Sequence, residues 1–369
     1  MDNKNILNYR LIANFDWIIF WLTIAVSVVG VVALYSSGWG VNHYIYIKQI
    51  YWIFYGLVGM MLILYVDYHS LERFAYIFYL AIIVTLVAVA LYGKAVSGAK
   101  RWFSFALFTF QPSEIAKIII IITLARYFDD KKIKGLYRIR DLIPPAVIVL
   151  IPVILIAKQP DLGTAAILFF IFISMSFFIG INARSLFILI ILSFVSLPIL
   201  WHFMKDYQRN RILTLLNPHI DPLGSGYHTI QSEIAIGSGG YIGKGFMSGT
   251  QSHLNFLPEK HTDFIFSVFA EEMGFIGALF LIILYIIIIV KGIDVIHCAR
   301  NRSGSLIAAG AVSMLTFHII FNIGMTIGLF PIVGIPLPFM SYGGSSLVTN
   351  FMVIGLLLNI KMRRFKDMG

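Results

Sequence analysis

Long apolar runs constrain the fold of this chain more than any other feature. Several of them reach about 20 residues, the length of an α-helix that crosses a bilayer. A transmembrane β-barrel would instead alternate apolar and polar residues in short segments. Charged residues make up only 12% of the sequence, against roughly a quarter in soluble domains. The sequence therefore predicts an all-α polytopic integral membrane protein.

Ten membrane spans are predicted, and together they form one transmembrane domain over residues 1–369. The first apolar run is too long for the core of a signal peptide and lacks a cleavage site, so it is interpreted as a retained span. A single cysteine leaves no intrachain disulfide to staple the domain. The predicted spans are 15–36, 46–66, 72–92, 112–128, 142–157, 163–180, 185–203, 263–290, 304–328 and 342–360.

Basic residues predict the orientation of these spans. They gather in short loops at 129–140 and 361–366, which the positive-inside rule places in the cytoplasm together with both termini. Spread over several loops in this way, the net charge of +10 does not indicate nucleic-acid binding. Two longer connections, 93–111 and 204–262, are then exoplasmic. The larger keeps many apolar residues and is predicted to be ordered, with a membrane-surface helix around Tyr227, Ile230 and Ile234.

Asp263 is the first candidate for chemistry. It lies where the larger exoplasmic loop enters a strongly apolar span, and an acidic residue there suggests a functional site. Thr262 is expected to cap that helix, which would place Asp263 in its first turn. Lys260, His261 and the helix dipole are expected to lower its pKa. Helix capping and general-base catalysis both remain open for this carboxylate.

Two further acidic residues begin predicted helices. Glu114 and Lys117 lie three residues apart, so they share one helix face. They could form a structural ion pair or line the same outward cavity as Asp263. Asp161 lies in a tight exoplasmic connection, where turn formation explains it as well as chemistry does.

Other polar features carry weaker indications. Arg101 and Trp102 could hold a diphosphate and a sugar, although interfacial anchoring is the ordinary role of such a Trp. The glycine run 237–245 lacks the spacing of a phosphate-binding loop and is interpreted mainly as a turn, with approach of its N–H groups to an anion as the alternative. The segment 330–346 breaks the helix pattern and is expected to wall the cavity. No metal-ligand spacing is present.

Five runs of residues resemble the SEDS family (shape, elongation, division and sporulation proteins). The resemblance covers nearly the whole chain in order, and its short tails and its 237–261 segment are more similar to the RodA branch than to FtsW. The runs are Ala99-Lys100-Arg101-Trp102, Gln111-Pro112-Ser113-Glu114, Gln159-Pro160-Asp161-Leu162-Gly163-Thr164, Leu257-Pro258-Glu259-Lys260-His261-Thr262-Asp263-Phe264 and Pro336-Leu337-Pro338-Phe339-Met340-Ser341-Tyr342-Gly343-Gly344.

The resemblance implies a peptidoglycan glycosyltransferase of cell elongation and cell shape that polymerises lipid II at the outer face of the bacterial plasma membrane. It also implies a class B penicillin-binding protein as partner. The family's essential acid matches Asp263, and its other functional polar residues match Trp102, Glu114, Lys117 and Asp161. The acceptor hydroxyl would lose its proton to Asp263 and attack the donor sugar with inversion, releasing undecaprenyl diphosphate.

Positive charge near the departing diphosphate would assist this reaction. The candidates for substrate binding are Lys100, Arg101, Arg209, Arg211, Lys260 and His261. A divalent cation, Mg²⁺ or Mn²⁺, could share that role. The alternatives are a flippase for lipid-linked cell-wall precursor, an FtsW-like division or sporulation polymerase, and a noncatalytic scaffold. The clustering of informative polar residues at the outer face favours the enzyme over a transporter, whose charges gather near the midplane.

Overall fold

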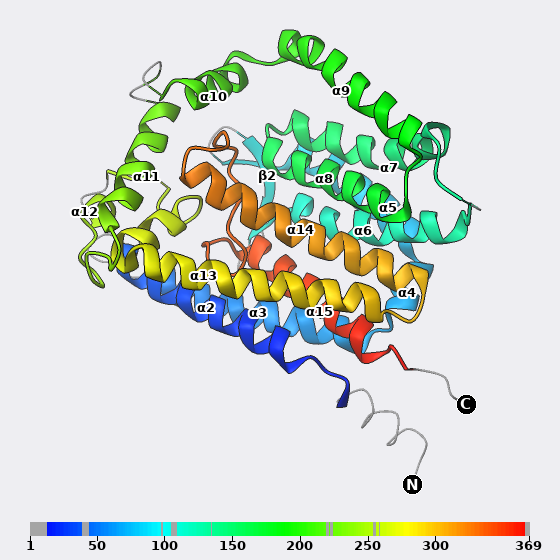
Figure 1. Cartoon of the computed structure of the whole chain (residues 1–369), viewed down its shortest axis with the longest axis horizontal. Coiled ribbons are helices and arrows are strands. Elements are labelled where there is room, and N and C mark those ends of the chain that lie inside the picture. Colours follow the sequence, from blue (N-terminus) through cyan, green and yellow to red (C-terminus); the bar gives the residue numbers. More distant parts are fainter. Residues whose placement is uncertain are drawn as a thin grey trace.

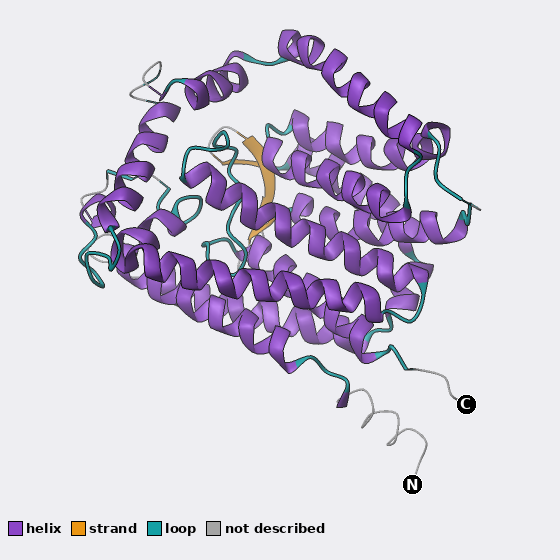
Figure 2. Cartoon of the chain, viewed as in Figure 1, coloured by secondary structure: helices purple, strands orange, loops and turns teal. Residues whose placement is uncertain are grey.

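A bundle of long helices makes up most of the molecule (Figure 1). The computed structural model describes residues 13–38, 44–96, 99–104, 109–133, 135–218, 221, 224–253, 256–257 and 259–365. The first and the last described residues lie at the same end of the bundle (Figure 1). The small sheet lies toward its other end (Figure 2).

Eight of the described helices are long and apolar enough to cross a membrane, which confirms the predicted polytopic helical fold. Two more helices, α6 (Pro112–Asp130) and α9 (Ala183–Phe203), occupy the remaining predicted spans. Helix α6 is less apolar because it carries several charged residues. In α9 the apolar part is the shorter stretch Ala183–Leu192. The eight are α2 (Trp17–Gly38), α3 (Ile45–Tyr65), α5 (Ala75–Tyr92), α7 (Ile139–Lys158), α8 (Leu162–Ile179), α13 (Ile265–Cys298), α14 (Arg302–Thr326) and α15 (Gly344–Met362).

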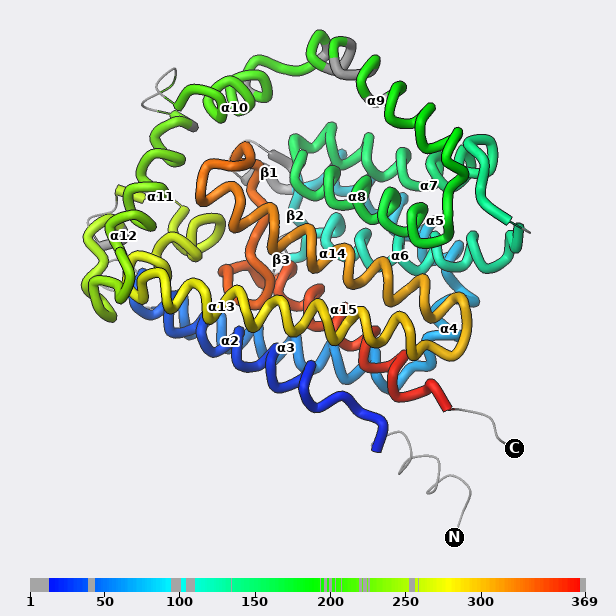
Figure 3. Tube along the Cα trace, viewed as in Figure 1, coloured from blue at the N-terminus to red at the C-terminus, as the bar shows by residue number. Residues whose placement is uncertain are grey.

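The two longer connections are also structured. In the smaller one, β1 (Lys94–Val96), β2 (Ala99–Ser104) and β3 (Thr109–Phe110) form an antiparallel sheet in that order, an addition to the predicted all-α architecture. The chain leaves the bundle along α9 and returns through α10 (Asp206–Leu216), α11 (Ser225–Gly239) and α12 (Thr250–His253) to the start of α13 (Figure 3). A further short helix, α4 (Tyr68–Arg73), follows α3.

Helix α11 is present where the sequence predicts a membrane-surface helix, and the face that packs on the bundle consists of small residues. Its buried positions include Thr229, Ser232 and Ala235, which pack toward α13 and α14. The Ser232 hydroxyl lies 2.7 Å from Ser267 Oγ of α13. Ile234 is 44% exposed. Small residues therefore dock this helix onto the bundle, because they allow the close approach that bulky side chains prevent.

The glycine run completes a broken helix. α13 has 34 residues, and Gly274 interrupts it with φ 66° and ψ −166°. The N–H groups of Phe275 and Ile276 donate to the carbonyls of Gly240 and Tyr241, at 2.9 and 3.2 Å. In return, the N–H groups of Lys244 and Gly245 donate to the carbonyls of Glu271 and Glu272. These bonds satisfy backbone groups that the break would leave unpaired.

Gly243 is required at this junction. Its φ is +88°, and a Cβ there would lie 2.1 Å from the carbonyl oxygen of Glu272. The glycine run is thus a close backbone contact with α13. The N–H groups of Lys244 and Gly245, which could have approached an anion, are used in that contact.

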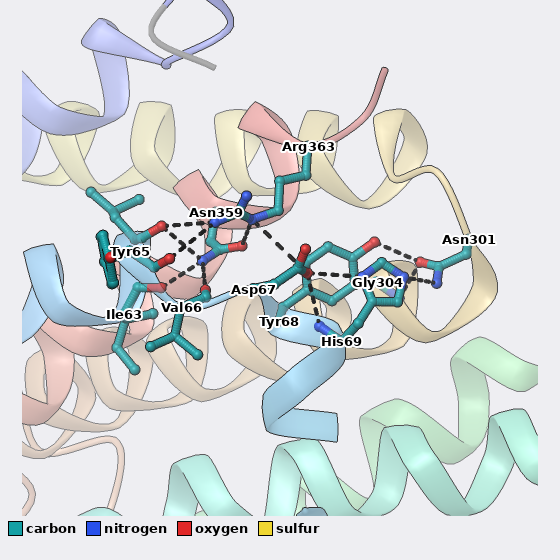
Figure 4. Close-up of polar contacts among 11 residues, drawn as sticks. Ile63, Tyr65, Val66, Asp67, Tyr68, His69, Asn301, Gly304, Asn359 and Arg363 are labelled. Atoms are coloured by element: carbon teal, nitrogen blue, oxygen red, sulfur yellow. Dashed lines mark hydrogen bonds and ion pairs between the residues drawn. The ribbon is translucent and has the colours of Figure 1, made fainter. Parts of the chain in front are cut away.

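At the opposite end of the bundle, Asn359 of α15 and Arg363, which follows that helix, bind the end of α3 (Figure 4). Asn359 Nδ2 donates to the carbonyls of Ile63 and Val66, at 2.5 and 2.6 Å. Arg363 donates to Asn359 Oδ1 at 2.8 Å and to the Leu64 carbonyl at 3.0 Å. The last carbonyls of a helix have no partner within it, so these two side chains replace the missing hydrogen bonds.

Candidate active site

One cavity of about 180 Å³ collects residues from all five sequence runs named above. Its wall includes Trp102 from β2, Glu114 from α6, Asp161 at the start of α8, Asp263 before α13 and Tyr342 from the segment between α14 and α15. These residues are far apart in the sequence. The predicted wall formed by the irregular 330–346 segment is confirmed, because several of its residues line the cavity.

Asp263 does not lie in the first turn of α13, contrary to prediction. The helix begins at Ile265 with Phe264 at the capping position, so Asp263 precedes it and lies outside its membrane-spanning segment. The Thr262 hydroxyl donates to Glu259, and α13 has no side-chain hydrogen bond from a residue at its capping position. The capping interpretation therefore fails, and the Asp263 carboxylate faces the cavity.

The predicted direction of the Asp263 pKa shift is also wrong. Burial, followed by the charge of Glu259, raises the pKa of Asp263 from 3.8 to about 6, although Arg211 and a hydrogen bond from Thr262 act to lower it. The adjacent cations in the sequence do not dominate, because removal of the carboxylate from water favours its protonated form. The result is a carboxylate that is ionised at neutral pH and more basic than an exposed one.

The backbone beside Asp263 is held by other segments. Asn322 of α14 donates to the Asp263 carbonyl at 3.0 Å and to the Ile335 carbonyl at 2.7 Å. Ser341 Oγ donates to the Thr262 carbonyl at 2.6 Å. Fixed main-chain contacts of this kind hold a reactive side chain in one place.

Glu114 and Lys117 form the predicted ion pair, with Lys117 Nζ 2.8 Å from Glu114 Oε2. The Lys117 side chain is 0% exposed, and Glu114 but not Lys117 is part of the cavity wall. His318 of α14 also lines the cavity, and its Nε2 lies 3.2 Å from Lys117 Nζ. Helical spacing predicted the pair, whereas His318 was not among the predicted site residues. The available signal was an ionisable residue within an apolar span.

Asp161 caps a helix and also lines the cavity. Its carboxylate caps α8, accepting from the Thr164 N–H at 3.2 Å and from Thr164 Oγ1 at 3.0 Å. It also accepts from Gln111 Nε2 at 3.1 Å and contributes to the cavity wall. The carboxylate therefore joins the starts of α6 and α8 at the cavity.

Of the basic residues proposed to bind substrate, Arg101 lines the cavity. Its Nε donates to the Gln159 carbonyl at 2.7 Å, and its Nη2 donates to the Pro160 carbonyl. Its guanidinium therefore stabilises the turn that leads into Asp161, and Arg101 places a positive charge beside the cavity. The side chain of Lys100, its neighbour, lies outside the described part of the structure.

The remaining basic candidates do not line this cavity. Arg209 donates to the carbonyls of Trp201 and His202 at the end of α9. Arg211 lines a smaller depression beside Thr229. Lys260 is buried, which lowers its pKa. His261 Nδ1 lies 2.9 Å from Ser37 Oγ, and burial together with the Lys260 charge lowers its pKa to about 4, so this imidazole is neutral at pH 7.

No group of three or more His, Cys, Asp or Glu side chains that could hold a metal ion occurs among the described residues. The acidic residues of the cavity wall therefore do not form a ready metal site by themselves.

Comparisons with known proteins agree with the residue pattern. A family model described as "Cell cycle protein", for FtsW, RodA and SpoVE, matches residues 13–366. The chain is 42% identical over 318 residues to the peptidoglycan glycosyltransferase MrdB of Escherichia coli strain K12, covering 84% of this chain and 83% of that one. It is 33% identical over 435 residues to the peptidoglycan glycosyltransferase RodA of Treponema pallidum strain Nichols, covering 97% and 100%.

Solved structures share the fold. A chain from work described as "Structural coordination of polymerization and crosslinking by a peptidoglycan synthase complex" has a TM-score of 0.84 and 32% identity, covering 96% of this chain and 99% of that one. The rod shape determining protein RodA of Thermus thermophilus has a TM-score of 0.72 and 28% identity, covering 96% and 98%. These matches confirm the predicted family resemblance.

Proposed function

Because the chain belongs to the FtsW, RodA and SpoVE family and is a multi-pass membrane peptidoglycan glycosyltransferase, we propose that it polymerises lipid II in cell elongation, with Asp263 as the general base. The observation that carries this assignment is the cavity in which Asp263 meets Trp102, Glu114 and Asp161. The named relatives are glycosyltransferases, which favours the enzyme over a flippase.

In the proposed reaction, the Asp263 carboxylate takes the proton of the acceptor GlcNAc 4-hydroxyl. The oxygen then forms a bond to C1 of the donor MurNAc, and the C1–O bond to the diphosphate breaks. Undecaprenyl diphosphate leaves with that electron pair, and the configuration at C1 inverts from α to β. A base with a pKa of about 6 suits this task, because general-base efficiency is greatest when the pKa lies near the working pH.

The leaving diphosphate needs positive charge more than it needs a proton. Arg101 is our leading candidate, because its guanidinium is fixed by two backbone carbonyls at the cavity wall. Such fixation means that little reorganisation is needed as negative charge develops on the departing oxygen. A divalent cation, Mg²⁺ or Mn²⁺, bound to the diphosphate would add positive charge at the departing oxygen.

We place the cavity at the outer face of the bacterial plasma membrane, with both termini cytoplasmic, because the basic loops lie at the opposite end of the spans. The lipid tails of substrate and product would stay in the bilayer while the sugars react in the cavity. A class B penicillin-binding protein is the proposed partner for crosslinking. The similarity to a chain of a peptidoglycan synthase complex supports that partnership.

The decisive experiment measures glycan formation from labelled lipid II by the purified protein and its Asp263→Asn variant. Asn keeps the size of the side chain but cannot accept the proton, so the rate should fall about 10²- to 10⁴-fold. The carboxylate does not cap α13, so folding should survive, as a retained melting temperature would show. Asp206→Asn is the matched control, because the Asp206 side chain is 96% exposed. Fast polymerisation by folded Asp263→Asn would end the assignment and make Glu114 or Asp161 the next candidate.

A further inference from the structure

We propose that His318 is a positioning residue of the glycosyl-transfer site, holding the Lys117 ammonium and the Pro336 carbonyl in fixed positions and thereby orienting the Glu114 carboxylate. This inference rests on the proposed function and adds a residue to it. His318 lines the same cavity as Asp263 and Glu114. It is fully buried, near the outer end of α14.

The contacts of His318 fix its tautomer. Its Nδ1 lies 3.2 Å from the Pro336 carbonyl oxygen, which can only accept, so Nδ1 carries the proton. Its Nε2 lies 3.2 Å from Lys117 Nζ, and an ammonium can only donate, so Nε2 is the acceptor. Both ring nitrogens are then used in the neutral form. His318 is therefore not a proton acceptor for the substrate; its role is to hold its two partners.

Lys117 cannot keep its position through Glu114 alone. Its side chain is 0% exposed, so water does not solvate the ammonium, and Glu114 Oε2 lies 2.8 Å away. Removal of the His318 acceptor would leave a buried charge with one fewer hydrogen bond, which is unfavourable where no water can replace that bond. The ammonium would then move toward another acceptor. The Glu114 carboxylate would move with it, because the two groups form one ion pair.

The second contact of His318 is with the segment that helps to hold the backbone beside Asp263. Pro336 lies in the irregular segment between α14 and α15, and further along that segment Ser341 Oγ binds the Thr262 carbonyl. One turn along α14 from His318, Asn322 binds the carbonyls of Ile335 and Asp263. His318 thus joins α6 to the same segment that holds the proposed base. A displacement at this point would change the distance between the two sides of the cavity.

The test compares His318→Leu with His318→Gln in the lipid II assay. Leu keeps an apolar volume but offers neither donor nor acceptor, whereas the Gln amide can donate to Pro336 and accept from Lys117. We expect Leu to lower kcat on the order of 10- to 100-fold with a smaller change in KM, because misplaced groups cost rate. Gln should restore most of kcat. Phe317→Leu is the control, since it removes a buried ring from the same helix without altering the cavity wall.

A double-mutant cycle separates positioning from loss of stability. In a Lys117→Met background, His318→Leu should cause far less further loss of kcat than it does alone. Nitrogen-15 NMR of the wild type should show His318 as the Nδ1–H tautomer. The inference is overturned if folded His318→Leu keeps wild-type kcat, if the Leu and Gln variants lose equal activity, or if the two losses are additive. Failure of the proposed function would look different: the wild type would make no glycan, or Asp263→Asn would remain active.

Discussion

The rate of polymerisation should depend on pH through Asp263. A general base works only when it is ionised, so kcat/KM should fall as the pH falls through the Asp263 pKa of about 6. At pH 7 about 90% of such a carboxyl group is ionised, and at pH 5 about 10%. The expected loss between these two values is therefore roughly tenfold. A carboxyl with the unperturbed pKa of 3.8 would lose less than about a tenth of its activity over the same range.

Two substitutions test the physical cause of that pKa. Glu259 raises the pKa of Asp263 and Arg211 lowers it, so Glu259→Gln should move the acid limb of the profile to lower pH and Arg211→Gln to higher pH. The assay is kcat/KM for labelled lipid II between pH 4.5 and 8.5, a range of about four pH units that covers both directions of shift. Asp206→Asn removes an exposed carboxylate and should leave the profile unchanged. A wild-type limb below pH 5, or two variants that move the profile the same way, would refute the electrostatic argument.

Two predictions concern the rest of the molecule. Asn359→Leu should lower the free energy of unfolding in detergent by about 2–4 kcal/mol, because the carbonyls of Ile63 and Val66 lose their donor. Asn210→Leu is the control at an exposed position, and equal melting temperatures for the two variants would contradict the prediction. For topology, a Ser248→Cys, Cys298→Ser protein should react with a membrane-impermeant thiol reagent in intact cells, whereas the native exposed Cys298 should react only after permeabilisation. The reverse labelling pattern would invert the orientation.

Local sequence patterns determined the architecture because the bilayer leaves few alternatives. A run of apolar residues must form a helix when no water can satisfy its backbone, so the spans follow from composition and length. The Glu114–Lys117 pair follows from helical spacing, since residues three apart share a face. The separate runs around Trp102, Glu114, Asp161 and Asp263 can also be recognised in the sequence. A cavity shared with Asp263 was one of two interpretations of Glu114 and Lys117, and helical periodicity alone does not predict the assembly of all four runs.

Tertiary structure decided the quantities that depend on residues distant in the chain. The sequence places Lys260 and His261 beside Asp263 and predicts a lowered pKa, but burial and Glu259 raise it. Helical periodicity predicted a membrane-surface helix at α11, whereas its contact with α13 and α14 through small residues depends on the fold. Burial and Coulomb interactions are set by separation in space, while the sequence reports only separation along the chain. That is why the sequence identified the acid at this site and only the fold determined its basicity.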